Sequence, residues 1–236
     1  MQAIANWTNL SETTFVLPAT DSQADYQVRI FTPQNELPFA GHPTIGTAYA
    51  LLEAGLIKAK EGKLVQQCGA GLVTLTVSES SHISFELPKP KITPLDAMHT
   101  EKLAEILKCE INTQWNAALV DVGARWIVLQ AVNADAVLDS QPDFAALKEH
   151  DLEMKVTGAT VFGFHENNDE QKHIEVRSFA PSCGINEDPV CGSGNGSVAS
   201  FIRYYGILPA QNDVVVSSQG GAVGRDGQLQ LELYQD

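Results

Sequence analysis

The chain has 236 residues, 44% of them hydrophobic and 19% charged, which is typical of a folded globular protein and excludes wholesale disorder. Its 29 acidic side chains outnumber the 15 basic ones, and the net charge of −14 argues against a nucleic-acid partner, because such partners are bound by clustered Lys and Arg. No apolar run approaches the roughly 18 residues that cross a bilayer, and the first residues lack the pattern of a secretion signal. We therefore expect no membrane partner and a cytoplasmic location.

In the first half of the chain, the hydrophobic pattern predicts a helix, two strands, a second helix and a further strand. The helix is expected at residues 1–7, and the strands at 13–17, around Arg29-Ile-Phe, and at 72–77. The second helix follows a turn that contains Pro and Gly. Its apolar residues fall at i, i+3, i+4 and i+7, which predicts one buried face made of Ile45, Ala48, Tyr49 and Leu52.

The second half repeats this order and adds a strand pair before it. The strands predicted there are 117–122, 125–131, 160–164, a segment around Arg177-Ser-Phe, 213–217 and 228–234. The first two are joined through Gly123, and a helix is expected at 144–152. A last helix has the same apolar spacing as its counterpart in the first half, which predicts a buried face of Val198, Phe201, Ile202 and Tyr205.

Two ordered motifs, about 150 positions apart, indicate an internal repeat. Each consists of Arg-x-Phe-x-Pro, then an acidic residue two positions before Pro, and then Gly at the start of a helix, from Arg29 to Gly41 and from Arg177 to Gly192. We therefore predict an α+β fold of two pseudo-symmetric lobes, 1–88 and 95–225, with a terminal strand at 226–236 that joins either sheet. The three prolines of residues 88–94 suit an extended connection. Because the strand pair before the second repeat has no upstream counterpart, the first lobe is expected to lack its N-terminal strands.

Metals and organic cofactors are not indicated by the sequence. The cysteines form neither a CxxC pair nor a zinc spacing, so reduced thiols and no metal site are expected at Cys68, Cys109, Cys183 and Cys191. The run Gly192-Ser-Gly194-Asn-Gly is not a dinucleotide fingerprint, because its spacing is GxGxG and Asp213 precedes a strand. No GxxxxGK[ST] phosphate loop is present, and no cofactor is expected.

The glycine-containing starts of the two main helices are candidate anion sites. The first N–H groups of a helix lack internal partners and carry partial positive charge, so they attract carboxylates. The segments concerned are Gly41-His42-Pro-Thr44 and Gly192-Ser193-Gly194-Asn195, and they would suit a small carboxylate-bearing substrate. A purely structural role for these glycines, as a helix cap and a close-packing turn, is an equally open alternative.

Several segments together resemble the phenazine-biosynthesis (PhzF-like) family of isomerases. They are Asn9-Leu-Ser-Glu12-Thr, Phe31-Thr-Pro with Glu36-Leu-Pro, Gly41-His42-Pro-Thr44, and Glu187-Asp188-Pro-Val-Cys-Gly-Ser193-Gly. The resemblance covers nearly the whole chain, in order. It implies the diaminopimelate-epimerase fold, in which each lobe has a mixed sheet wrapped around a central helix and the active site lies between the lobes. It also makes a homodimer plausible.

The resemblance further implies a role for each matching residue. Glu12 would be the general acid and base, and His42, Asp188 and Ser193 would hold the substrate. The N–H groups of Gly192, Ser193 and Gly194 would receive its carboxylate. The chemistry implied is a cofactor-independent proton shift on a small molecule, for which a carboxylate needs a pKa raised toward neutrality.

Three alternatives remain open from the sequence. Epimerases of this fold use one thiol at each helix start; Cys191 matches one of these positions, but the other is Ala40, so a hybrid of Glu12 with Cys191 is the variant to consider. There a helix N-terminus would lower the pKa of the thiol. A cysteine hydrolase built on Cys191 and His42 would lack an orienting third residue. The last alternative is a non-catalytic paralogue that binds a metabolite or a partner protein.

Overall fold

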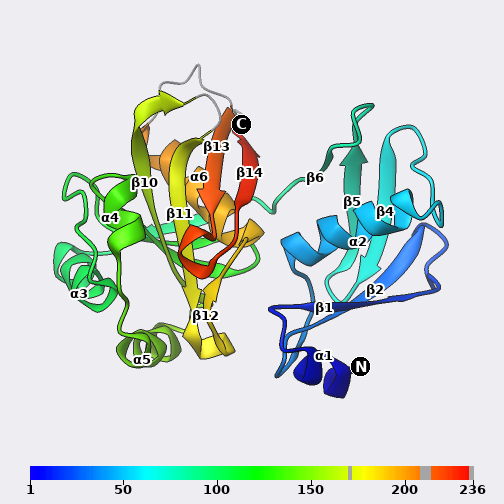
Figure 1. Ribbon diagram of the computed structural model, residues 1–236, viewed down its shortest axis with the longest axis horizontal. Coiled ribbons are helices and arrows are strands. Elements are labelled where there is room, and N and C mark those ends of the chain that lie inside the picture. Colours follow the sequence, from blue (N-terminus) through cyan, green and yellow to red (C-terminus); the bar gives the residue numbers. More distant parts are fainter. Residues whose placement is uncertain (170–171, 208–213, 234–236) are drawn as a thin grey trace. The chain divides into compact units, whose positions relative to one another are not determined.

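The chain forms two compact units, Met1–Glu86 and Leu87–Asp236, in a computed structural model that describes residues 1–169, 172–207 and 214–233. Figure 1 shows the helices and strands of each unit.

The first unit is a six-stranded sheet with a helix packed on it (Figure 1). Its strands are β1 (Thr13–Leu17), β2 (Tyr26–Phe31), β3 (Glu36–Leu37), β4 (Lys63–Cys68), β5 (Gly71–Val77) and β6 (Ile83–Phe85). Its helices are α1 (Gln2–Thr8) and α2 (Gly41–Glu53). The strand order is β1-β2-β4-β5-β6, with β3 paired to β2. Ala48 and Leu51 of α2 pack on Val28, Ile30 and other core residues of the sheet.

The second unit is an eight-stranded sheet with helices on both faces (Figure 1). Its strands are β7 (Lys91–Pro94), β8 (Ala118–Asp121), β9 (Arg125–Gln130), β10 (Gly158–Asp169), β11 (Lys172–Ala180), β12 (Ile185–Asp188), β13 (Val214–Gln219) and β14 (Gly227–Glu232). Its helices are α3 (Ala97–Leu107), α4 (Ala134–Asp139), α5 (Phe144–Met154) and α6 (Gly192–Tyr205), with 3-10 turns at Pro181–Cys183 and Gly221–Val223.

Alternate residues along the central strands of this sheet supply two separate cores, as expected for a sheet that is covered on both faces. Val128 of β9 packs in one core with α6, which contributes Val198, Phe201 and Ile202. Its neighbour Leu129 packs in the other core, with α3, α4 and α5. The helix face predicted for the last repeat is therefore buried, with Tyr205 partly buried at its end.

The internal repeat is confirmed by strand pairing. In the first unit β1 pairs antiparallel with β2, β2 parallel with β4, and β4 antiparallel with β5. In the second unit β10, β11, β13 and β14 pair in the same three ways. The short strands β3 and β12 both pair antiparallel with the equivalent neighbour, and α2 and α6 follow them. The α+β class and the two pseudo-symmetric lobes, each a mixed sheet with a central helix, are as predicted.

Strand β9 extends the second sheet beyond the repeat, because it pairs parallel with β10 and continues through β8 to β7. Within the described residues, the first sheet ends at β1 and has no strand in the place equivalent to β9. The predicted pair across Gly123 is present, and this glycine has a φ of 98°. That conformation costs little without a Cβ atom.

Two details differ from the sequence prediction. Residues 88–94 are not only a connection, because Lys91–Pro94 forms β7 and pairs with β8. The buried face of α2 is wrong in part: Tyr49 is 53% exposed, whereas Thr44 and Thr47 are buried. The two threonines find hydrogen-bond partners inside the unit, Gln66 for Thr44 and Thr14 for Thr47, so hydrophobicity alone did not identify them.

The terminal strand, for which either sheet was expected, is β14 of the second sheet. Asp213 and Tyr234, which bounded two predicted strands, lie outside the described residues.

Candidate functional site

The two main helices start at equivalent places in the repeat. Helix α2 begins at Gly41 after the N-cap residue Ala40, and α6 begins at Gly192 after the N-cap residue Cys191. His42 and Ser193 are each the second residue of their helix. The alignment of Ala40 with Cys191, made from the sequence, therefore holds in the structure.

The thiol of Cys191 caps its own helix. Its Sγ accepts the backbone N–H of Gly194 at 3.3 Å. Of the three N–H groups expected to receive a substrate carboxylate, that of Gly194 thus has an intramolecular partner. Because the N–H of Gly194 is already bonded, the N–H groups of Gly192 and Ser193 are the better candidates to bind an anion.

Close packing explains why residue 194 is a glycine. A Cβ atom there would lie 2.5 Å from Ser178 Oγ, 3.0 Å from Thr160 Oγ1 and 3.1 Å from Cys191 Sγ. At Gly196 a Cβ atom would lie 2.0 Å from Leu87 Cδ1, the end of a flexible side chain, which would have to shift. Close packing therefore supports a structural role for Gly194, and this role does not exclude ligand binding at the helix start.

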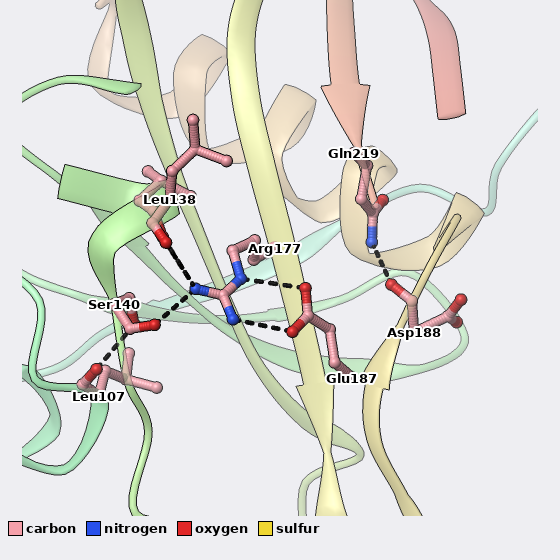
Figure 2. A network of polar contacts seen from close by, with 8 residues as sticks. Leu107, Leu138, Ser140, Arg177, Glu187, Asp188 and Gln219 are labelled. Carbon is pink, nitrogen blue, oxygen red and sulfur yellow. Dashed lines mark hydrogen bonds and ion pairs between the residues drawn. The ribbon is translucent and has the colours of Figure 1, made fainter. Parts of the chain in front are cut away.

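A buried glutamine fixes the turn that carries the predicted site residues. Gln219 is 1% exposed, and its Nε2 donates to the backbone carbonyl of Asp188 at 2.7 Å, a bond drawn in Figure 2. Its Oε1 accepts the backbone N–H of Cys191 at 3.0 Å and the side-chain Nδ2 of Asn195 at 2.7 Å. One side chain of β13 thus joins the end of β12, the helix cap and the first turn of α6.

The side chains of this turn also have defined partners. Asp188 is nearly buried, and its Oδ1 accepts the backbone N–H of Val190 at 3.0 Å. Ser193 is half-buried, and its Oγ accepts the indole N–H of Trp126 at 3.0 Å. Asp188, Cys191, Gly192, Ser193 and Gly194 are therefore brought together in one turn and helix start. Sequence reasoning missed Gln219 and Trp126, because a lone Gln or Trp in a strand carries no motif.

The environment of Cys191 opposes ionisation of its thiol. Burial is the main cause that raises the pKa of Cys191 well above its usual value, and the negative charge of Asp188 raises it further. The N–H of Gly194 lowers the pKa but does not outweigh burial. The lowered pKa expected for a thiol at a helix N-terminus is therefore not found at Cys191, whose pKa is shifted in the opposite direction.

The first unit holds the other two predicted residues. Glu12 is half-buried and immediately precedes β1, whose first residue, Thr13, pairs with Phe31. His42 is exposed in the first turn of α2. Both residues therefore lie where a repeat element begins. In this unit Thr44 takes the place of Asn195, and its hydroxyl is bonded to Gln66 of β4 at 2.9 Å, as Asn195 is bonded to Ser217 of β13 at 2.5 Å.

Each repeat also contains a bidentate ion pair beneath its acidic turn. Arg177 and Glu187 join through two contacts of 3.0 and 2.8 Å, and the side chains are only 7% and 6% exposed (Figure 2). Arg29 and Glu36 join through two contacts of 2.7 Å and are 42% and 41% exposed. The Arg and Glu of the repeat motif therefore form an ion pair that stabilises the turn.

A pocket of about 530 Å³ lies on the second unit beside this buried ion pair. Its lining includes Ser140, Phe144, Arg177, Asn186 and Glu187, and none of the predicted site residues. Within residues 1–169, 172–207 and 214–233, no group of three or more His, Cys, Asp or Glu side chains is placed to hold a metal ion. Across the same residues, no helix is long and apolar enough to cross a membrane.

Comparison with known proteins adds a family and three similar proteins. Residues 1–236 match the family described as phenazine biosynthesis-like protein. Antisense-enhancing sequence 1 of Schizosaccharomyces pombe is 44% identical over 232 residues, which are 95% of this chain and 77% of the relative. Trans-2,3-dihydro-3-hydroxyanthranilate isomerase of Pseudomonas fluorescens is 30% identical over 226 residues, 95% of this chain and 76% of the relative. The crystal structure of a phenazine biosynthesis protein of the PhzF family from Bacillus anthracis has a TM-score of 0.82 at 25% identity, covering 97% of this chain and 78% of the other.

Proposed function

Because the chain belongs to the family of phenazine biosynthesis-like proteins, we propose that it moves a proton on a small carboxylate-bearing metabolite, with Glu12 as the general acid and base. The family resemblance expected from the sequence is confirmed, and the protein is an isomerase like its relatives. What we propose beyond this is the class of substrate and the role of each residue.

The observation that carries the role of Glu12 is the pair of helix caps. A two-thiol mechanism needs an ionisable group at both N-cap positions, and one of them is Ala40. The other, Cys191, has a raised pKa, so its thiol is poorly suited to remove a proton. Glu12 is the carboxylate that the family motif supplies in the first unit, and it is half-buried there.

The proposed reaction balances without a change of oxidation state. Glu12 takes a proton from a carbon of the substrate, and the electron pair of the broken C–H bond passes into the conjugated system beside the carboxylate. The same carboxyl group, whose proton exchanges with solvent, then delivers a proton to another carbon, where a new C–H bond forms. The relative from Pseudomonas fluorescens suggests a substrate of the dihydro-hydroxyanthranilate type.

The start of α6 would hold the substrate carboxylate. The helix dipole and the first N–H groups, which have no partner within the helix, favour an anion there, and the hydroxyl of Ser193 adds a donor. Because these dipoles are fixed by Gln219 and by the sheet, they would stabilise the charge that develops during proton transfer without rearrangement. Asp188 and His42 would bind the other polar groups of the substrate.

Turnover of trans-2,3-dihydro-3-hydroxyanthranilate and related amino and hydroxy acids tests the proposal. Glu12→Gln is expected to lower kcat by about 10²- to 10⁴-fold, the usual contribution of a general acid or base. Glu79→Gln, which alters an exposed carboxylate of the same unit, is the matched control and should leave kcat unchanged. Equal activity of wild type and Glu12→Gln would refute the role of Glu12.

A further inference from the structure

Trp126 is a buried side chain that the reaction described above does not use. It lies in β9, near the middle of the second sheet, and is 3% exposed. Its indole N–H donates to Ser193 Oγ at 3.0 Å, and the two residues are 67 positions apart in the sequence. The bond therefore joins a rigid strand to the start of α6.

The chemistry of the two groups fixes the direction of this bond. An indole N–H is only a donor, so the hydroxyl oxygen of Ser193 must be the acceptor. A serine hydroxyl has one proton of its own, which is then left to point elsewhere. Among the residues that the structure describes, Cys191 Sγ lies near this hydroxyl at 3.8 Å and is a weak acceptor, whereas a ligand carboxylate would form a shorter, charge-assisted bond.

From this geometry we propose that Trp126 is a positioning residue, which holds the Ser193 hydroxyl as a hydrogen-bond donor to the carboxylate of the substrate. The inference rests on the proposed function for the identity of the ligand, and on the structure for the bond itself. Ser193 is half-buried and so reaches solvent, while Trp126 is packed in the core with Val128, Phe162 and Phe201. A side chain locked by packing behind a binding group limits the motion of that group.

A double-mutant cycle separates positioning from a merely structural role. Trp126→Phe is expected to raise KM for trans-2,3-dihydro-3-hydroxyanthranilate about two- to tenfold, the effect of one neutral hydrogen bond, with kcat nearly unchanged. Ser193→Ala should raise KM more, by about 10- to 100-fold, because it removes a bond to a charged group. If Trp126 acts through Ser193, then Trp126→Phe adds nothing in the Ser193→Ala background.

Two further variants guard against an effect of lost packing. Benzothienylalanine at position 126 keeps the shape of the ring system but replaces the N–H by sulfur, and should give the same rise in KM as Trp126→Phe. Trp115→Phe removes a tryptophan that packs against the same core and should leave KM unchanged. If the increases in KM caused by Trp126→Phe and Ser193→Ala multiply in the double variant, or if benzothienylalanine restores wild-type KM, the proposal is overturned.

The bond can also be tested without turnover, by the indole N–H signals in a proton–nitrogen NMR spectrum. The chain has three tryptophans, and the signal of Trp126 is identified by its loss in Trp126→Phe. Ser193→Ala, and titration of wild type with anthranilate as a carboxylate probe, should both shift this signal. Absence of turnover with both shifts present would refute the proposed function and support the positioning role. A signal that moves with neither change would overturn the positioning role, whatever the substrate.

Discussion

The buried pair Arg177–Glu187 leads to a quantitative prediction, because the repeat supplies its own control. Arg177 donates Nε and Nη2 to Glu187, and its Nη1 donates to the backbone carbonyls of Leu138 and Ser140 at 3.3 and 2.6 Å (Figure 2). Its Nη1 also donates to the backbone carbonyl of Val137 at 3.1 Å. Arg177→Met removes all five bonds and leaves a buried carboxylate without a counter-charge.

The expected loss of stability is about 3–5 kcal/mol, the usual result of removing one partner from a buried ion pair. This is a large share of the roughly 5–15 kcal/mol that stabilises a typical domain. Arg29→Met breaks the equivalent exposed pair, where water replaces the lost contacts and screens the charge, so little change is expected.

Urea unfolding followed by tryptophan fluorescence measures the effect in the second unit. Trp126 and Trp115 are buried and half-buried there, whereas Trp7 of the first unit is 84% exposed and should report little. Unfolding of the Arg29→Met variant is therefore followed by circular dichroism. The double variant Arg177→Met/Glu187→Met should recover part of the loss, because it removes the orphaned carboxylate. Equal effects of Arg177→Met and Arg29→Met would refute the argument from burial.

Three other predictions concern single side chains. Gln219→Leu should cost about 2–6 kcal/mol, because it strands two buried backbone groups at about 1–3 kcal/mol each, whereas Gln228→Leu on the neighbouring strand should cost little; urea unfolding compares them, and equal midpoints would contradict the role of Gln219. Cys191 should react with iodoacetamide much more slowly than the half-buried Cys68, since burial and a raised pKa both oppose attack; peptide mass spectrometry measures the rates, and faster reaction at Cys191 would contradict this environment. The pKa of His99 is lowered, first by burial and then by His150. Neutral His99 therefore contributes to the free energy of unfolding above the ordinary histidine pKa, and this contribution is lost as the pH falls from there through the lowered pKa. His99→Gln should reduce the loss of unfolding free energy between pH 7.5 and 5.5, and an unchanged pH dependence would contradict that assignment.

Much of the fold follows from patterns that the sequence displays directly. The strand at Thr13–Leu17 and the helix from Phe144 are located by apolar periodicity, and the repeat by its ordered Arg, Pro and Gly positions. Both signals are read directly along the chain, so they do not depend on knowledge of which distant residues are in contact.

Where the sequence reasoning failed, distant partners decide the outcome. Thr44 and Thr47 are buried because Gln66 and Thr14 satisfy their hydroxyls, a fact that no local pattern contains. Strand β7 contains Pro94, which breaks helices but is tolerated at the end of a strand on the edge of a sheet.

The candidate site shows the same division. Asp188, Cys191 and Ser193 could be predicted because they share one motif, and the structure places them in one turn. Gln219 and Trp126 lie in separate strands and are brought to the turn only by the pairing of the sheet. The direction of the pKa shift at Cys191 also needed the structure, since the helix N-terminus and burial act in opposite directions.

The measurement that tests the central claim most directly is the incorporation of deuterium from D2O into the substrate or product, followed by NMR for wild type and Glu12→Gln. A proton that is carried by a carboxylate exchanges with solvent during turnover, so wild type should place deuterium at the carbon that is reprotonated. The account predicts that this incorporation disappears in Glu12→Gln while the protein stays folded. Incorporation that continues at the wild-type rate in Glu12→Gln would contradict it and would assign the proton transfer to another group.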